Sequence, residues 1–318
     1  MLSSSSLPRI AIACQGGGSH TAFTAGVLKG LLRDSPTDRP FEIAALSGTS
    51  GGAICAALAW QGLILGGGTA ALEEFWSRNL ADSLQEVWLN NVILHAVRAG
   101  ERGSLLGINP NTSPVDWAKR ELQREVAGVF EPEEVARSFN DTSPHLFVSA
   151  VNVLSGDFEV FEDAAVSTET LLASAAIPSL FQAVQLGENY YWDGLFSENP
   201  PLLGLSKAPL DEIWIVQINP RARTELPRTF AEITDRHNEL IGNLSLERDV
   251  MFLERLNSFV QTGALSRDVH RPVKIRRIVM KRDLDYASKL DRRPSFVREL
   301  MAHGEEEAEI FLTYHSSG

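Results

Sequence analysis

Hydrophobic runs alternate with glycine-rich turns over the first 60 residues of the chain. The apolar run 9–14 ends at three consecutive glycines, and 20–32 then carries apolar residues at helical spacing. A second apolar run, 41–47, ends at another glycine-rich turn, and 53–60 is apolar on all sides, as in a buried helix. This repeated order of strand, turn and helix predicts a parallel sheet covered by helices.

Strand pairs joined by short turns follow in the middle of the chain. Runs 146–154 and 158–161 flank a Ser-Gly-Asp turn, and runs 183–186 and 190–192 flank a Gly-Glu-Asn turn. Both pairs are predicted to be hairpins. A helix is expected between them at 168–176, and the proline at position 178 is expected to end it.

The last third of the chain is more polar and mainly helical. One more buried strand is predicted at 212–218, and a further strand near 274–280. The segment 81–107 has no clear period, although it holds a cluster of apolar residues. These are Trp88, Leu89, Val92, Ile93 and Leu94. We interpret this segment either as an ordinary core-facing helix or as a lid or interfacial surface.

The composition is that of an ordinary globular protein, with 44% hydrophobic and 22% charged residues among 318. The formal net charge is −12, although the run 271–277 is locally basic. This charge argues against nucleic acid as a partner and against electrostatic capture by anionic lipid surfaces. No apolar stretch of about 20 residues and no signal peptide is found, so the expected location is cytoplasmic. Cys14 and Cys55 lie in apolar runs and are expected to be buried free thiols.

A serine stands in the second glycine-rich turn. Gly48-Thr49-Ser50-Gly51-Gly52 fits the nucleophile elbow G-x-S-x-G, with an apolar strand before it and an apolar helix after it. Glycines remove side chains that would clash in so sharp a turn, and the helix directs its positive dipole end toward the site. Ser50 is therefore the candidate nucleophile. The alternative is a turn needed only for close packing of strand and helix.

The first glycine turn, Gly16-Gly17-Gly18, offers backbone N–H groups just before a predicted helix, which suits an anion. A dinucleotide-binding fingerprint would need glycine where Thr21 stands, and the Gly-Lys-Ser/Thr of a P-loop is missing. The functional interpretation that remains is an oxyanion hole. A tight turn without a function is the alternative.

Asp193-Gly194 follows the aromatic run 190–192. Taken alone, an Asp-Gly pair is typical of a turn.

These three motifs in this order resemble the patatin-like phospholipase family over about residues 9–205. The segment 173–178 resembles the family's helix-to-proline segment before the aspartate, and Asn199 and Pro201 stand where the family has them after it. The resemblance implies a three-layer α/β/α patatin-like fold with a mostly parallel sheet and a helical C-terminal extension.

The same resemblance implies a catalytic core at 9–220, with 221–318 packed on it as one unit. It also implies a Ser-Asp dyad in which Asp193 accepts the Ser50 proton directly and the first glycine turn holds the oxyanion. The expected substrate is a lipid or another acyl ester, with transient contact to a membrane surface and without a metal or cofactor. The oligomeric state stays open.

The sequence departs from the family pattern at two places. After the glycines the family has a basic residue and then glycine, whereas this chain has Ser19-His20-Thr21, so His20 is expected to take the place of the basic residue. The aspartate motif usually ends in glycine or alanine, whereas Leu195 stands here and is expected to narrow the acyl pocket.

Three other interpretations stay open at this point. A Ser-His-Asp triad would use His303, but Ser50 follows only two predicted strands, which is too early for an α/β-hydrolase. A lipid- or partner-binding protein that has lost activity would explain the departures in the motifs. An acyltransferase would use the same dyad with an alcohol in place of water.

Overall fold

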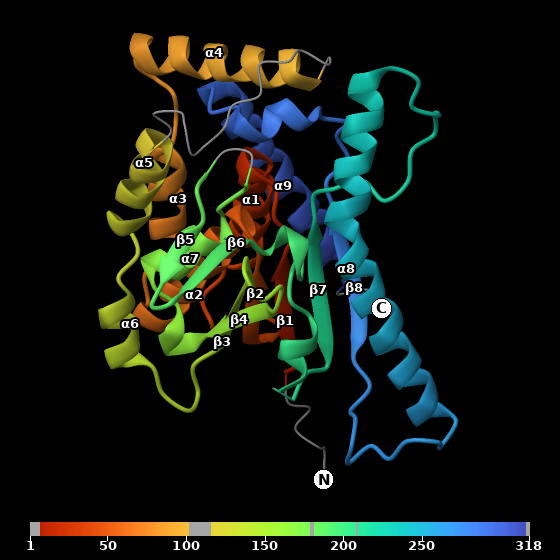
Figure 1. The fold of residues 1–318 in the computed structure, drawn as a ribbon. Coiled ribbons are helices and arrows are strands. Elements are labelled where there is room, and N and C mark those ends of the chain that lie inside the picture. The colour runs from red at the N-terminus through yellow and green to blue at the C-terminus, as the bar shows by residue number, and fades with distance from the viewer. Residues whose placement is uncertain (1–6, 102–115, 179–180, 208, 316–318) are drawn as a thin grey trace.

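The structure is a computed structural model that describes residues 7–101, 116–178, 181–207 and 209–315. A sheet of eight strands lies at its centre (Figure 1). The strands are β1 (Arg9–Cys14), β2 (Glu42–Gly48), β3 (His145–Asn152), β4 (Phe158–Glu162), β5 (Val184–Leu186), β6 (Asn189–Asp193), β7 (Glu212–Gln217) and β8 (Lys274–Val279).

Helices surround this sheet. The α-helices are α1 (Ala22–Leu31), α2 (Gly51–Leu65), α3 (Ala70–Arg78), α4 (Leu84–Glu101), α5 (Asp116–Ala127), α6 (Pro132–Ser138), α7 (Thr168–Ser174), α8 (Phe230–Gln261) and α9 (Pro294–His315). The short 3-10 helices are η1 (Gly18–Thr21), η2 (Asp163–Ala165), η3 (Gly194–Phe196), η4 (Leu203–Lys207) and η5 (Tyr286–Leu290).

The sheet is mostly parallel. Its hydrogen-bonded order is β5-β6-β3-β2-β1-β7-β8, and β4 pairs with β3 off this path. β1 runs parallel to β2 and β7, β2 runs parallel to β3, and β7 runs parallel to β8. The two predicted hairpins are confirmed as the antiparallel pairs β3–β4 and β5–β6.

Helices cover both faces of the sheet. Successive side chains of a strand point to opposite faces, so the contacts of alternate residues show which helices lie on each face. On β1, Ile10 and Ile12 join a core cluster with side chains of α1, α2 and α9. Ala11 and Ala13, which alternate with them, join a second cluster that includes Leu246 of α8. The chain therefore has the three-layer α/β/α architecture that the family resemblance implies.

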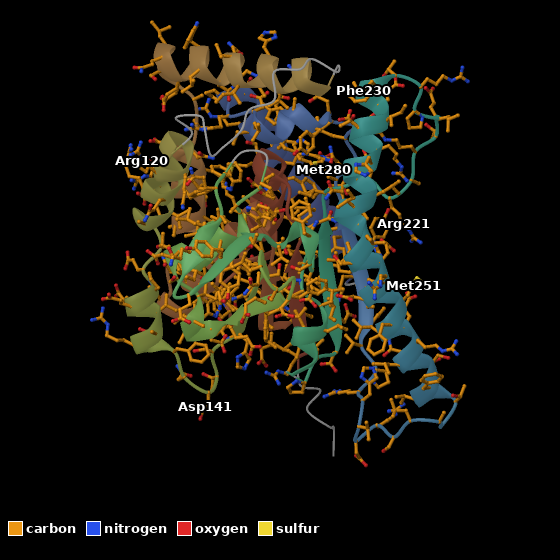
Figure 2. The ribbon with its side chains drawn as sticks, in the orientation of Figure 1. Arg120, Asp141, Arg221, Phe230, Met251 and Met280 are labelled. Atoms are coloured by element: carbon orange, nitrogen blue, oxygen red, sulfur yellow. The ribbon has the colours of Figure 1, made fainter. Side chains whose placement is uncertain are left out.

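The C-terminal third contributes both to the sheet and to the helical layers. β8 extends the sheet beside β7, and α9 packs along α1. The two helices approach closely because Gly26 has no side chain: a Cβ there would lie 1.9 Å from the carbonyl oxygen of Met301. α8 keeps exposed hydrophobic side chains, among them Phe230 and Met251 (Figure 2). The division of the chain at residue 220 stays a prediction.

Two elements differ from the expected pattern. The helix expected from residue 20 is preceded by the 3-10 turn η1, in which Gly18 adopts a φ of 56° that favours glycine. Segment 81–107 forms α4 as far as Glu101, with Leu94 buried but Trp88 67% exposed. The rest of that segment, 102–107, lies outside the described residues.

Both cysteines are free and buried, as predicted. In the part of the chain that the structure describes, no helix is long and apolar enough to cross a membrane.

Candidate active site

Ser50 occupies the sharp turn between β2 and α2. Its φ of 57° lies in the left-handed region, where a residue other than glycine is strained. Its N–H donates to Ser174 Oγ at 2.9 Å, which holds this conformation. A Cβ on Gly48 would lie 2.6 Å from Ala53 Cα, and one on Gly52 would lie 2.4 Å from a carbonyl oxygen of β1. The turn therefore needs its glycines and has the geometry of a nucleophile elbow.

The register of β3 brings Asp193 to the end of β2. β2 ends at Gly48, opposite Val148, and β6 ends at Asp193, opposite Ala150. β4 pairs with residues of β3 that also pair with β2 or with β6. It must therefore lie along the opposite edge of β3 from both of these strands. β2 and β6 therefore share one edge of β3 and meet end to end. This arrangement places Asp193 beside the turn that carries Ser50.

The carboxyl group of Asp193 is buried and only partly hydrogen-bonded. Its Oδ1 accepts the N–H of Leu195 at 2.8 Å. Its Oδ2 is buried and accepts no well-formed hydrogen bond from the described residues, although the Ser50 hydroxyl lies close enough to lower the pKa of the carboxyl. Burial raises the pKa of Asp193 to about 7, and the N–H of Leu195, the hydroxyl of Ser50 and the ammonium of Lys289 counter this rise only in part. A carboxyl with a free oxygen and a pKa near neutrality is a candidate proton acceptor.

The loop Gly16–Gly18 lies against the serine turn. A Cβ on Gly16 would lie 2.9 Å from Ser50 Cβ. The N–H of Gly16 donates to Asn199 Oδ1 at 2.7 Å, so it is not free to bind an oxyanion. The N–H groups of Gly17 and Gly18 have no hydrogen-bond partner among the described residues. These two donors are the ones left for an anion.

Asn199 ties the glycine loop to α8. It is fully buried, its Nδ2 donates to the carbonyl oxygen of Gly242 at 2.8 Å, and its N–H donates to Ser245 Oγ at 3.0 Å. The sequence predicts neither the contact of Asn199 with the glycine loop nor the one between Ser174 and the serine turn. The sequence motif marks where both residues stand in the chain, but no local pattern shows what a side chain contacts in a distant segment.

His20 is buried and neutral. The Ser288 hydroxyl donates to the carbonyl oxygen of Asp285 at 2.6 Å, so His20 Nε2–H is the donor in its 2.7 Å hydrogen bond with Ser288 Oγ. Burial lowers the pKa of His20 to about 3, and Lys289 acts in the same direction. The expectation that His20 replaces a basic residue is therefore wrong, because burial beside an ammonium group disfavours its charged form.

His303, the candidate third member of a triad, lies elsewhere. It belongs to α9, where its ring packs 5.3 Å from the ring of Phe23 and its Nε2 accepts the N–H of Lys281 at 3.4 Å. None of its contacts with described residues involves Ser50 or Asp193. Within the described ranges, no cluster of three or more His, Cys, Asp or Glu residues is placed to hold a metal ion.

Residues 12–206 match the family model described as patatin-like phospholipase. The matched range contains both glycine turns and Asp193. Among curated protein sequences, none matches this chain.

Thirteen chains of solved structures match this chain, including the following three. VipD from Legionella pneumophila is 13% identical, with 98% of this chain and 67% of that chain covered and a TM-score of 0.46. A chain of the heterodimeric ExoU–SpcU complex, from the type III secretion system of Pseudomonas aeruginosa, is 13% identical. The match covers 95% of this chain and 52% of that chain, with a TM-score of 0.35. Human GIVD cytosolic phospholipase A2, in complex with methyl gamma-linolenyl fluorophosphonate, is 20% identical. The match covers 49% of this chain and 23% of that chain, with a TM-score of 0.32.

Proposed function

This chain belongs to the patatin-like phospholipase family, and we propose that it hydrolyses carboxylic ester bonds of lipids through an acyl-enzyme on Ser50, with Asp193 as the general base. Family membership supports lipid ester hydrolysis as the general activity. The observation that carries the finer proposal is the free, buried Oδ2 of Asp193 beside a serine held in an elbow turn. No histidine is needed between the two groups.

The proposed reaction has two halves. In the first, Ser50 Oγ attacks the ester carbonyl carbon, its proton passes to Asp193, and the N–H groups of Gly17 and Gly18 bind the developing oxyanion. Asp193 then returns the proton to the leaving alcohol as the C–O bond breaks, which leaves the acyl group on Ser50. In the second half, water takes the place of the serine hydroxyl, and Asp193 again accepts and returns one proton.

The environment of Asp193 suits both halves of this reaction. A base that must accept a proton and return it works best when its pKa lies near the working pH. Burial raises the pKa of Asp193 to about 7. An exposed aspartate has a pKa of about 4, so at neutral pH it stays ionised and is a weaker base.

Access to the dyad requires movement, because Ser50 is 5% and Asp193 1% exposed. Leu195 follows the dyad aspartate and packs toward α8, with Cδ1 3.5 Å from the place that a Cβ on Gly242 would take. We infer that an acyl chain reaches Ser50 when the cover of the site moves. A lid role of α4 in that movement is part of the proposal.

Replacing Trp88 by alanine is expected to slow hydrolysis of micellar or vesicle phospholipid about three- to tenfold and to leave a short soluble ester unaffected. Trp88 is 67% exposed on α4, and an exposed tryptophan favours the interface of a lipid aggregate. Rates on both substrates check this expectation. Phe158→Ala, which removes a 61% exposed aromatic ring on β4, is the matched control. Equal effects of Trp88→Ala on the two substrates would show that α4 has no interfacial role.

A fluorophosphonate probe tests the proposed function directly. In the parent protein, Ser50 Oγ is expected to attack the phosphorus of the probe and displace fluoride. Mass spectrometry then locates the new Oγ–P bond on the peptide that carries Ser50. Hydrolysis of p-nitrophenyl esters of increasing acyl length then measures the depth of the pocket. A folded protein that neither labels nor hydrolyses any ester would contradict the proposal and favour a lipid- or partner-binding role.

A further inference from the structure

The glycine loop has no charged side chain of its own at the site, yet it packs against the backbone of a lysine. Gly18 packs on η5 so closely that a Cβ there would lie 2.2 Å from the carbonyl oxygen of Lys289. Lys289 Nζ donates to Asn219 Oδ1 at 3.0 Å. Its side chain also lines a small pocket together with His20 and Met280, and Met280 is labelled in Figure 2.

We propose that Lys289 is a positioning residue of the hydrolytic site: its ammonium holds Asn219, which adjoins the glycine loop, and its charge stabilises the Asp193 carboxylate. The inference rests on the proposed function, since it assigns a role within that reaction. Lys289 lies beyond the range 12–206 that matches the family model, so the C-terminal third would supply part of the site.

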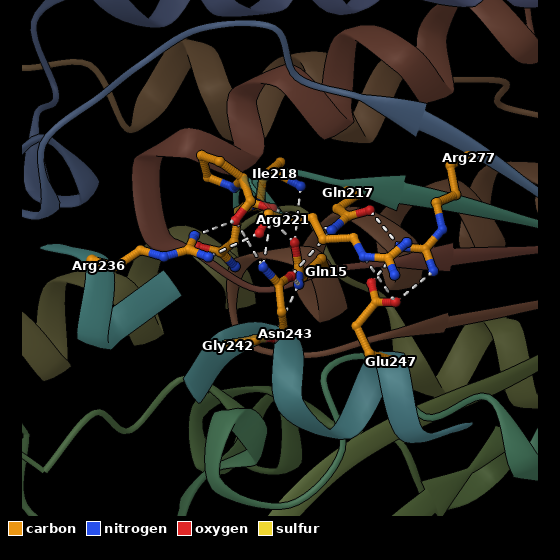
Figure 3. Close-up of polar contacts among 11 residues, drawn as sticks. Gln15, Gln217, Ile218, Arg221, Arg236, Gly242, Asn243, Glu247 and Arg277 are labelled. Carbon is orange, nitrogen blue, oxygen red and sulfur yellow. Dashed lines mark hydrogen bonds and ion pairs between the residues drawn. The ribbon is translucent and has the colours of Figure 1, made fainter. Parts of the chain in front are cut away.

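A buried network of hydrogen bonds connects Lys289 to the glycine loop through Asn219. Asn219 Nδ2 donates to the carbonyl oxygen of Gly16 at 3.4 Å, and Gln15 Oε1 accepts the N–H groups of Asn219 and Ile218, each at 2.9 Å. Gln15 Nε2 in turn donates to Asn243 Oδ1 of α8 at 2.9 Å (Figure 3). The loop is therefore held between β7, α8 and η5.

Lys289 also acts on the charge of the dyad. Burial raises the pKa of Asp193, and the ammonium of Lys289 is the last of the three groups that oppose this rise, so it favours the carboxylate that accepts the serine proton. The carboxylate of Glu239 is already paired with Arg223 at 2.6 Å and with Arg236 at 3.0 Å. The hydrogen bond of Lys289 Nζ goes to a neutral amide, which leaves its charge less compensated.

Burial lowers the pKa of Lys289 to about 8, although Glu239, Asp193 and Asp235 oppose that shift. The titratable and charged groups around it come from every neighbouring element. They are His20 of η1, Asp193 of β6, Asp235 and Glu239 of α8, and Arg282 of the segment before η5. Beyond them, Asp285 acts on His20 and pairs with Arg98 of α4. Loss of the Lys289 proton above pH 8 would then weaken the site.

The test is the pH dependence of kcat/KM for a short p-nitrophenyl ester, followed at the isosbestic wavelength of the leaving group. The parent rate is expected to rise through pH 7 as Asp193 ionises and to fall above pH 8 as Lys289 loses its charge. Lys289→Arg should extend the plateau to higher pH, because guanidinium stays charged. Lys289→Met should lower the plateau about tenfold and move the acidic limb to higher pH.

Lys29→Met is the matched control, because it removes an ammonium paired with Glu73 and Glu305 away from the dyad. It should keep the parent profile. Circular dichroism and melting temperature report whether each variant folds.

A parent profile that stays flat between about pH 7.5 and 9.5 overturns the inference, even if Lys289→Met does not fold. An unshifted acidic limb in folded Lys289→Met does so too, because loss of packing alone lowers the rate without moving that limb. A parent without Ser50-dependent hydrolysis overturns the proposed function, and this inference with it.

Discussion

Ser50→Ala is expected to lower kcat/KM for p-nitrophenyl esters by about a thousandfold or more, because nucleophilic serines in other hydrolases show losses of this size. The variant removes the attacking oxygen and leaves the loop of Gly16–Gly18 and the buried Asp193 in place. Rates of the purified parent and variant across acyl lengths check the expectation, and fluorophosphonate labelling should disappear in parallel.

Ser47→Ala is the matched control for this substitution. Ser47 lies on β2, three positions before Ser50, and is also buried. Its hydroxyl has no hydrogen-bond partner among the described residues, so its removal should leave both folding and activity close to those of the parent. Equal rates for Ser50→Ala and the parent would remove Ser50 from the mechanism.

Asp193→Asn is expected to reduce kcat/KM about as strongly, because an amide cannot accept the serine proton. It should also stabilise the folded protein at pH 8. The pKa of Asp193 is about 7 in the folded state and about 4 in an unfolded chain, so the folded state holds this proton more tightly. Stability therefore falls as pH rises from about 4 to about 7, and the amide avoids this loss.

Two measurements separate these effects. The melting temperature of Asp193→Asn at pH 8 should exceed that of the parent by about 2–5 °C, and the difference should vanish near pH 4. His303→Ala is the control for the base, because it should keep the parent activity. A hundredfold loss in His303→Ala would replace the dyad by a histidine-dependent mechanism. A tenth or more of parent activity in Asp193→Asn would show that Asp193 is not the general base.

Much of the fold follows from local pattern. The apolar run 9–14 and the run 212–218 became central strands of the sheet, because a strand buried on both faces needs apolar residues at successive positions. Both hairpins formed where short polar turns interrupt apolar runs. The segment 81–107 shows no clear period, because α4 leaves the apolar Trp88 exposed while it buries Leu94, so its apolar residues do not lie on one face.

By itself, the sequence determined the order of strands and glycine turns and marked Ser50 and Asp193 as candidates. Backbone geometry imposes these signals locally, since a sharp turn at φ 57° tolerates only small neighbours. Tertiary structure alone decided that β6 meets β2 along one edge of β3, that Asn199 binds the N–H of Gly16, and that Lys289 lies against Gly18. These contacts join residues up to about 270 positions apart, and such contacts depend on how whole layers pack, which no short pattern records.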